Sequence, residues 1–208
     1  MSAPLLGLLE EGKQRGFLGP GPVEDHLDHA RAFSVAVDSD PGRAVDLGAG
    51  GGVPGLVLAS VAWPATQWVL LDAQLKRTEF LAEAVRTLGL EHRVTVVTER
   101  AEVLGRDPAH RAGYDLVVAR SFGQPAVLAE CAAPLLGAAG CLVVSEPPDT
   151  TPADRWPAAP LDELGLEKVA GFEGTTPVPY HLVRIALTGR CPDRYPRRVG
   201  IPAKRPLF

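Results

Sequence analysis

The stretch AVDLGAGGGVPG, residues 44–55, decides the fold of this chain. Residues 44–47 predict a short buried strand, and four of the next five residues are glycine. Pro54 suits the first turn of a helix, because its missing N–H would have no partner there anyway. A strand that runs through a glycine loop into a helix is typical of an α/β protein. In open α/β sheets, ligands bind beyond the carboxyl ends of the strands.

Strands and helices alternate after this stretch. Apolar runs predict strands at residues 68–72, 94–97, 114–119 and 140–145, with helices at about 75–88 and 127–136. Two further strands, at 167–172 and 181–187, have no helix between them, so we expect them to form an antiparallel edge pair. We therefore predict an α/β fold with a mostly parallel sheet that is covered on both faces.

The charge of the chain is unevenly distributed. Its 208 residues carry a formal net charge of −4, but residues 189–208 hold six basic residues and one acidic residue, a net charge of +5. The remainder therefore carries −9. This pattern predicts a local contact with an anion, not a body coated for nucleic acid. We divide the chain into a helical front segment (1–40), a central domain (41–188) and a basic, proline-rich tail (189–208).

The cysteines and the apolar runs indicate in which cellular compartment the protein is expected. Cys131, Cys141 and Cys191 lack the paired spacing of a metal site or redox pair, which favours free thiols in a reducing cytoplasm. The longest weakly polar run, residues 131–144, is shorter than the roughly 20 residues of a membrane span. No basic-then-apolar segment follows Met1, so we expect no secretory signal. We predict a cytoplasmic protein without metal or membrane contact.

An acidic residue at the next strand end narrows the choice of ligand. Asp72 ends the second predicted strand, where its carboxylate can accept hydrogen bonds from a ribose. The spacing Gly-x-Gly-x-Gly differs from the dinucleotide fingerprint, and no Gly-Lys-Ser/Thr follows as in a Walker loop. This spacing behind an acidic residue is the pattern of S-adenosylmethionine enzymes. The alternative is a glycine turn that only tightens the junction, with Asp72 capping the next helix.

Five motifs together indicate a family. They are residues 46–55, residues 71–77 with Phe80 and Leu81, residues 100–102, residues 114–120 and residues 195–202. With them the chain resembles the bacterial small-subunit ribosomal RNA guanine-N7 methyltransferases of the glucose-inhibited division protein B type. The resemblance implies a class I S-adenosylmethionine-dependent methyltransferase with a Rossmann-like fold. It also implies that the acceptor is N7 of a guanine in 16S ribosomal RNA, and that ribosomal RNA or the small subunit is the partner.

The resemblance further implies roles for individual residues. Expected cofactor contacts are Gly48 and Val53 on the methionine side, Asp72 at the ribose, Ala101 and Glu102 by the adenine, and Arg120 between the cofactor and the target base. Lys76 and Arg77 are expected RNA contacts. Glu102 has an alternative as a solvated acid at a helix start, and the Lys76–Arg77 pair as an ordinary solvated helix face. We name no catalytic base, since guanine N7 carries no proton, and we expect Arg120 to orient the substrate.

The chain departs from the family pattern at two places. Its front section is shorter and lacks the usual Trp-Asn and Asn-Leu-Thr segments. Ser145-Glu146-Pro147 stands where members usually have Leu-Lys-Gly. Glu146 in place of a cation near an RNA-facing edge is expected to weaken phosphate binding. Two alternative functions follow: a paralogue that methylates a small metabolite, and a non-catalytic protein that binds the cofactor or the ribosome.

The tail has features of a segment that binds single-stranded RNA. Its prolines predict an extended, non-helical conformation. The ring of Tyr195 offers a stacking surface for a base, and Arg197 and Arg198 can each grip a phosphate with two hydrogen bonds. The alternatives are a charged segment that keeps the end of the chain soluble, or one that packs back onto the acidic body.

Overall fold

The computed structural model describes residues 3–148, 155–175 and 177–208. Residues 1–2 of the expected front segment, and 149–154 and 176 of the expected central domain, lie outside these ranges. The sheet has seven strands in the order β3-β2-β1-β4-β5-β7-β6. Its strands are β1 (Arg43–Leu47), β2 (Gln67–Asp72), β3 (Val94–Thr98), β4 (Tyr114–Ala119), β5 (Leu136–Ser145), β6 (Leu166–Gly174) and β7 (Tyr180–Leu187).

The first five strands are parallel, and the last two form an antiparallel pair at one edge, as predicted. β7 is the last strand in the sequence, but it lies between β5 and β6, so β6 forms the edge of the sheet. The strand β5 begins four residues earlier than expected, because the helix before it ends near Pro134. A register shift against β4 accommodates the additional residues.

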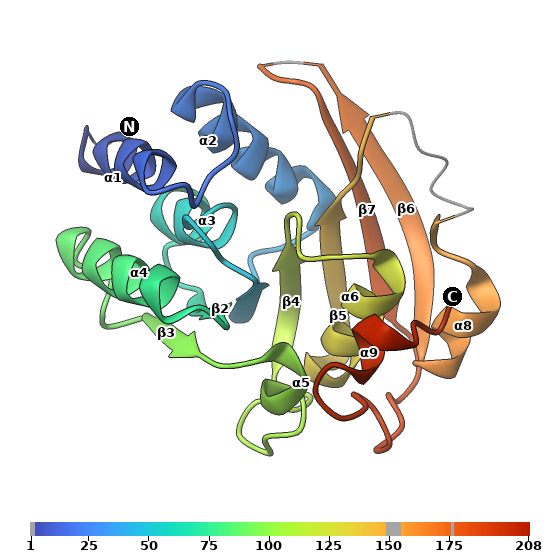
Figure 1. Ribbon diagram of the computed structural model, residues 1–208. Coiled ribbons are helices and arrows are strands. Elements are labelled where there is room, and N and C mark those ends of the chain that lie inside the picture. The colour runs from blue at the N-terminus through green and yellow to red at the C-terminus, as the bar shows by residue number, and fades with distance from the viewer. Residues whose placement is uncertain (1–2, 149–154, 176) are drawn as a thin grey trace.

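Helices cover both faces of the sheet (Figure 1). They are α1 (Ala3–Gln14), α2 (Val23–Ala32), η1 (Phe33–Ala36), α3 (Gly55–Val61), α4 (Leu75–Thr87), α5 (Ala101–Leu104), α6 (Pro125–Ala132), η2 (Ala133–Leu135), α8 (Ala158–Glu163) and α9 (Ile201–Lys204). One buried cluster joins a face of the sheet to α3, α4 and the front helices. A second joins the other face to α5, α6, α8 and the tail.

The front segment forms the helices α1 and α2 and packs onto the glycine loop. Leu5 and Leu9 of α1 and Leu27 of α2 share a buried cluster with Val53 of the loop and Val57 of α3. Helix α2 ends at Ala32, where the chain tightens into the 3-10 helix η1. The front helices therefore contribute directly to the surroundings of the loop.

The order in which successive strands join the sheet reverses between β1 and β4, which are parallel neighbours. The strand after β1 pairs on one side of it, whereas β4 pairs on the other. Such a switch point leaves a crevice at the carboxyl ends of the two strands. Gly48 follows β1 and Arg120 follows β4, so both residues lie at this crevice.

The tail folds back onto the body, and the expectation of an extended, non-helical segment was wrong. Residues 201–204 form the helix α9, which contacts α6. Pro202 is compatible with this helix because it occupies the first turn. Tyr195 is 3% exposed, and its hydroxyl donates a hydrogen bond to Glu163 at 2.6 Å. The ring therefore belongs to the core and is not a free stacking surface for a base.

Candidate active site

The glycine loop is held by backbone hydrogen bonds and by left-handed backbone conformations. The N–H groups of Gly48 and Ala49 both donate to the carbonyl of Leu71, at 2.8 and 2.9 Å. Gly48 has a φ of +74°, and a Cβ there would lie 2.9 Å from the ring of Phe122. Glycine is therefore required at this position both for conformation and for space.

Two buried carboxylates fix the loop from beneath. Asp46 accepts a hydrogen bond from the N–H of Gly55 at 2.7 Å, and Asp72 accepts one from the N–H of Gly50 at 3.1 Å. The other oxygen of Asp72 accepts from the N–H of Gln74 at 2.9 Å. Burial raises the pKa of Asp46 to about 7, although the hydrogen bond from Gly55 lowers it. Asp72 thus has a structural function in addition to its expected contact with a ribose.

One cavity of about 370 Å³ lies beside the loop. Four of the expected cofactor residues line it together: Gly48, Asp72, Ala101 and Glu102. Its volume lies within the usual range of small-molecule sites. The structure therefore brings these four residues together at one cavity. Their contact with a cofactor stays a prediction.

Glu102 connects this cavity to the tail. Its Oε1 accepts hydrogen bonds from the N–H of Gly200 at 2.9 Å and from Arg100 Nη2 at 3.1 Å. Burial raises the pKa of Glu102, but these donors outweigh that effect and hold the pKa below its ordinary value. Glu102 is only 4% exposed, so the alternative of a solvated acid at a helix start is wrong.

A second cavity of about 180 Å³ lies on the other side of Gly48. The remaining two expected cofactor residues, Val53 and Arg120, line it together with Arg77. Arg77 Nη1 lies 3.4 Å from Asp72 Oδ2, so this side chain points toward the loop. Its neighbour Lys76 is exposed on α4. RNA contact by these two residues stays a prediction, and the geometry favours Lys76 over Arg77.

Arg120 contacts His26 of the front segment, a residue that the sequence motifs did not predict to be part of the site. Arg120 Nη2 donates to His26 Nδ1 at 2.8 Å, and His26 Nε2 lies 3.1 Å from the carbonyl oxygen of Gly19. Because a guanidinium only donates and a carbonyl only accepts, His26 is the neutral tautomer with its proton on Nε2. Burial lowers the pKa of His26, and the nearby charge of Arg120 lowers it further, while the Gly19 hydrogen bond acts in the opposite direction. No local sequence pattern indicates this contact, because His26 and Arg120 are 94 positions apart.

The residues present fit S-adenosylmethionine. Arg120 Nη1 and Asp46 Oδ1 are buried beside the loop without a hydrogen-bond partner within the described ranges. Unsatisfied buried polar groups are rare and indicate a missing partner. The cofactor carries a carboxylate, to which Arg120 would donate hydrogen bonds. It also carries two ribose hydroxyls, and Asp72 would accept hydrogen bonds from them. The two cavities meet at Gly48, so one extended molecule would occupy both.

The two arginines of the tail have different surroundings. The guanidinium of Arg197 forms hydrogen bonds with both oxygens of Glu130, from Nε at 2.9 and 3.0 Å and from Nη2 at 2.6 Å. Arg197 Nη2 also donates to the carbonyl of Arg205 at 2.7 Å. Arg197 therefore anchors the tail and is not arranged to grip a phosphate with two free donors. Arg198 is exposed, and RNA contact stays a prediction for it.

Glu146 is not a free negative charge at the edge of the sheet, and its expected effect on phosphate binding stays a prediction. Its side chain is 2% exposed. It accepts hydrogen bonds from Arg155 Nε and, at 2.8 Å, from Trp156 Nε1. Because Arg155 neutralises the carboxylate, the pair adds no net charge to this edge.

The parts of the chain that the structure describes contain no helix long and apolar enough to cross a membrane. Across the same ranges, no three His, Cys, Asp or Glu side chains cluster as a metal site would require. The three cysteines are free and buried.

The chain is similar to proteins of one family over most of its length. The family model for rRNA small subunit methyltransferase G matches residues 23–146. The ribosomal RNA small subunit methyltransferase G of Roseiflexus castenholzii is 40% identical over 193 residues, which cover 89% of this chain and 80% of the relative. The corresponding protein of Prochlorococcus marinus strain NATL2A is 36% identical over 168 residues, covering 79% of this chain and 67% of the relative.

A solved structure with the same fold is the O-methyltransferase TomG from Streptomyces achromogenes in complex with S-adenosylmethionine. It superposes with a TM-score of 0.60 at 18% sequence identity and covers 91% of each chain. The prediction of a class I methyltransferase fold is confirmed, as is that of an S-adenosylmethionine-dependent methyltransferase. The chain belongs to the rRNA small subunit methyltransferase G family.

Proposed function

We propose that this protein methylates N7 of a guanine in the ribosomal RNA of the small subunit, in the cytoplasm. The observation that carries the proposal is the family match. It spans residues 23–146, which include the glycine loop, Asp72, Glu102, Arg120 and the front-segment residue His26. Most of the residues that line the two cavities lie within this matched segment.

The chemistry of the acceptor agrees with the residues at the site. When bound, the cofactor supplies a methyl group on a positively charged sulfur. The lone pair of guanine N7 forms the new bond to carbon while the sulfur–carbon bond breaks and its electrons stay on sulfur. The purine takes up the positive charge, and no proton has to be removed. The protein therefore has to align the two reactants and exclude water, which is a large part of catalysis in two-substrate reactions.

Arg120 is suited to this alignment because two elements hold it. It follows β4 at the switch point, and His26 of α2 accepts one of its hydrogen bonds. Its Nη1 is left for a ligand. Hence we assign Arg120 the positioning of the cofactor and the acceptor, with His26 fixing its orientation.

Exposed cations of the tail support a polyanionic acceptor. Ala203 of α9 lines the first cavity, its sequence neighbours Lys204 and Arg205 are exposed, and Arg198 of the same tail is exposed as well. Arg205 and Lys204 are held near the cavity because Arg197 and Glu130 anchor the tail. Lys and Arg at such positions bind phosphates and release counterions.

The competing acceptor is a small metabolite. The charge of Glu146, which favoured this acceptor in the sequence, is neutralised by Arg155.

The test is to incubate the protein with methyl-labelled S-adenosylmethionine in three separate mixtures. They contain purified small ribosomal subunits, protein-free RNA from those subunits, or a metabolite extract without macromolecules. We expect the label in RNA from one or both of the first two mixtures. Label in the metabolite extract alone would show that the acceptor is a small metabolite and not RNA. Cofactor binding without methyl transfer in any of the three mixtures would indicate a non-catalytic protein.

A further inference from the structure

A third cavity of about 300 Å³ adjoins both halves of the cofactor site. It shares Phe122 and Gly123 with the first cavity, and Ser121 with the second. It lies at the carboxyl ends of β4 and β5, between the loop that follows β4 and the residues that follow β5. An acceptor placed in it would be next to the cofactor site from which the methyl group comes.

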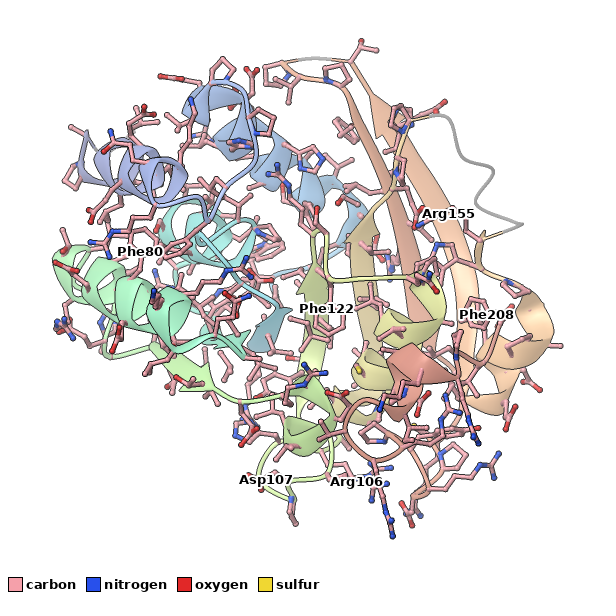
Figure 2. All side chains as sticks on the ribbon, in the orientation of Figure 1. Phe80, Arg106, Asp107, Phe122, Arg155 and Phe208 are labelled. Atoms are coloured by element: carbon pink, nitrogen blue, oxygen red, sulfur yellow. The ribbon has the colours of Figure 1, made fainter. Side chains whose placement is uncertain are left out.

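The lining of this cavity combines apolar and charged side chains. Phe122, Val144 and Trp156 contribute apolar surface, and Glu146 and Arg155 contribute the charged groups. Figure 2 labels Phe122 on the loop after β4 and Arg155 on the segment that leads to α8. The ring of Phe122 suits a purine, because every base has a π-face that packs on aromatic side chains.

Arg155 is held in a fixed orientation in the lining of the cavity. Its Nε donates to Glu146, whose other oxygen accepts from Trp156 Nε1 at 2.8 Å. The carboxylate is buried, whereas the side chain of Arg155 is 32% exposed. The two Nη groups of Arg155 have no hydrogen-bond acceptor among residues 3–148, 155–175 and 177–208. A guanidinium held through Nε presents its two remaining nitrogens to a ligand.

The chemistry of methylation determines which part of a nucleotide Arg155 binds. Arginine recognises either the O6–N7 edge of guanine or a phosphate with two hydrogen bonds. A hydrogen bond to N7 would occupy the lone pair that has to attack the methyl group. The phosphate is then the group that Arg155 can bind without blocking the reaction.

We infer that this third cavity is the acceptor-nucleotide site, in which the target purine packs against Phe122 and Arg155 binds its phosphate. Glu146 is a positioning residue that acts through Arg155. The inference rests on the proposed function, because it requires a nucleotide acceptor.

The test is a charge-relocation series assayed on protein-free RNA of the small subunit. We expect Arg155→Ala to raise the KM for RNA by roughly 10- to 100-fold, the value of a lost charge-assisted contact. The Kd for S-adenosylmethionine should stay within about twofold, since Arg155 does not line the cofactor cavities. Arg86→Ala is the matched control: it removes the same charge from an exposed position on α4, so its KM should match the wild type.

The double variant Glu146→Lys, Arg155→Ala distinguishes a substrate contact from a merely structural role. It returns a cation to the lining of the same cavity, so we expect the KM for RNA to recover to within about threefold of the wild type. Arg155→Lys, which keeps the charge without altering Glu146, should fall between wild type and Arg155→Ala. An Arg155→Ala variant that keeps the KM of Arg86→Ala would overturn the inference and leave the proposed function intact. If the wild type transfers no methyl group to RNA, the proposed function itself fails.

Discussion

Replacing Arg197 with alanine should destabilise the protein far more than replacing its neighbour Arg198. The carboxylate of Glu130 is 0% exposed, and the guanidinium of Arg197 supplies three of its four hydrogen bonds. Removing one partner of a buried ion pair costs about 3–5 kcal/mol, because a charge is left without compensation. The backbone N–H of residue 197 still donates to Glu130 at 2.7 Å in the variant, which favours the lower end, about 3 kcal/mol.

For a chain of this length, 1 kcal/mol corresponds to a shift of roughly 2–4 °C in the melting temperature. We therefore expect Arg197→Ala to lower the melting temperature by roughly 6–12 °C, measured by thermal unfolding without cofactor. Arg198→Ala is the control and should shift it by less than about 2 °C, since Arg198 is exposed. Adding Glu130→Gln to Arg197→Ala removes the buried charge and should recover part of the loss. Equal melting temperatures for the two single variants would refute the assignment of Arg197 as the anchor of the tail.

Three further predictions concern the cofactor site, the loop and the RNA contact. Asp72→Asn should weaken S-adenosylmethionine binding by about tenfold or more in calorimetry, because a charge-assisted hydrogen bond to the ribose is lost; unchanged affinity would remove Asp72 from the cofactor site. Burial raises the pKa of Asp46 to about 7, so the native state keeps a proton that the unfolded state has lost, and stability falls as the pH rises from about 4 to 7. Asp46→Asn should therefore raise the melting temperature by roughly 5 °C or more at pH 8 and by about half as much or less at pH 5, whereas an equal effect at both would contradict the raised pKa. Arg198→Ala should flatten the slope of log affinity for RNA against log salt by about 0.7, the value for one phosphate contact on a single strand, and an unchanged slope would exclude that contact.

The fold was predictable because its signals are local. The strand, glycine loop and helix of residues 44–55 follow one another in the chain, and alternation of apolar runs with helices defines a parallel sheet. The residues lining the first cavity follow the ends of neighbouring strands, where topology alone brings them together. Periodicity and spacing contain this information without reference to distant contacts.

The contacts that were missed join residues far apart in the sequence. Arg197 and Glu130 are 67 positions apart, and His26 and Arg120 are 94 positions apart. The tail sequence by itself, with several prolines and arginines, has the composition of an extended RNA-binding segment. Its actual conformation depends on a buried carboxylate on α6, which no local pattern reveals. The sequence likewise predicts an unfavourable charge at Glu146, because it does not show that Arg155 and Trp156 donate hydrogen bonds to this carboxylate.

Nucleoside mass spectrometry of RNA methylated by this protein tests most directly whether guanine N7 is the acceptor. Small-subunit RNA would be incubated with the protein and S-adenosylmethionine bearing a trideuterated methyl group, digested to nucleosides and separated against standards. We expect the label in 7-methylguanosine, and we expect Arg120→Ala to reduce it strongly. Label in a different methylated nucleoside would contradict the claim that the site presents guanine N7, and no labelled nucleoside from either subunit particles or free RNA would contradict the assignment of RNA as the acceptor.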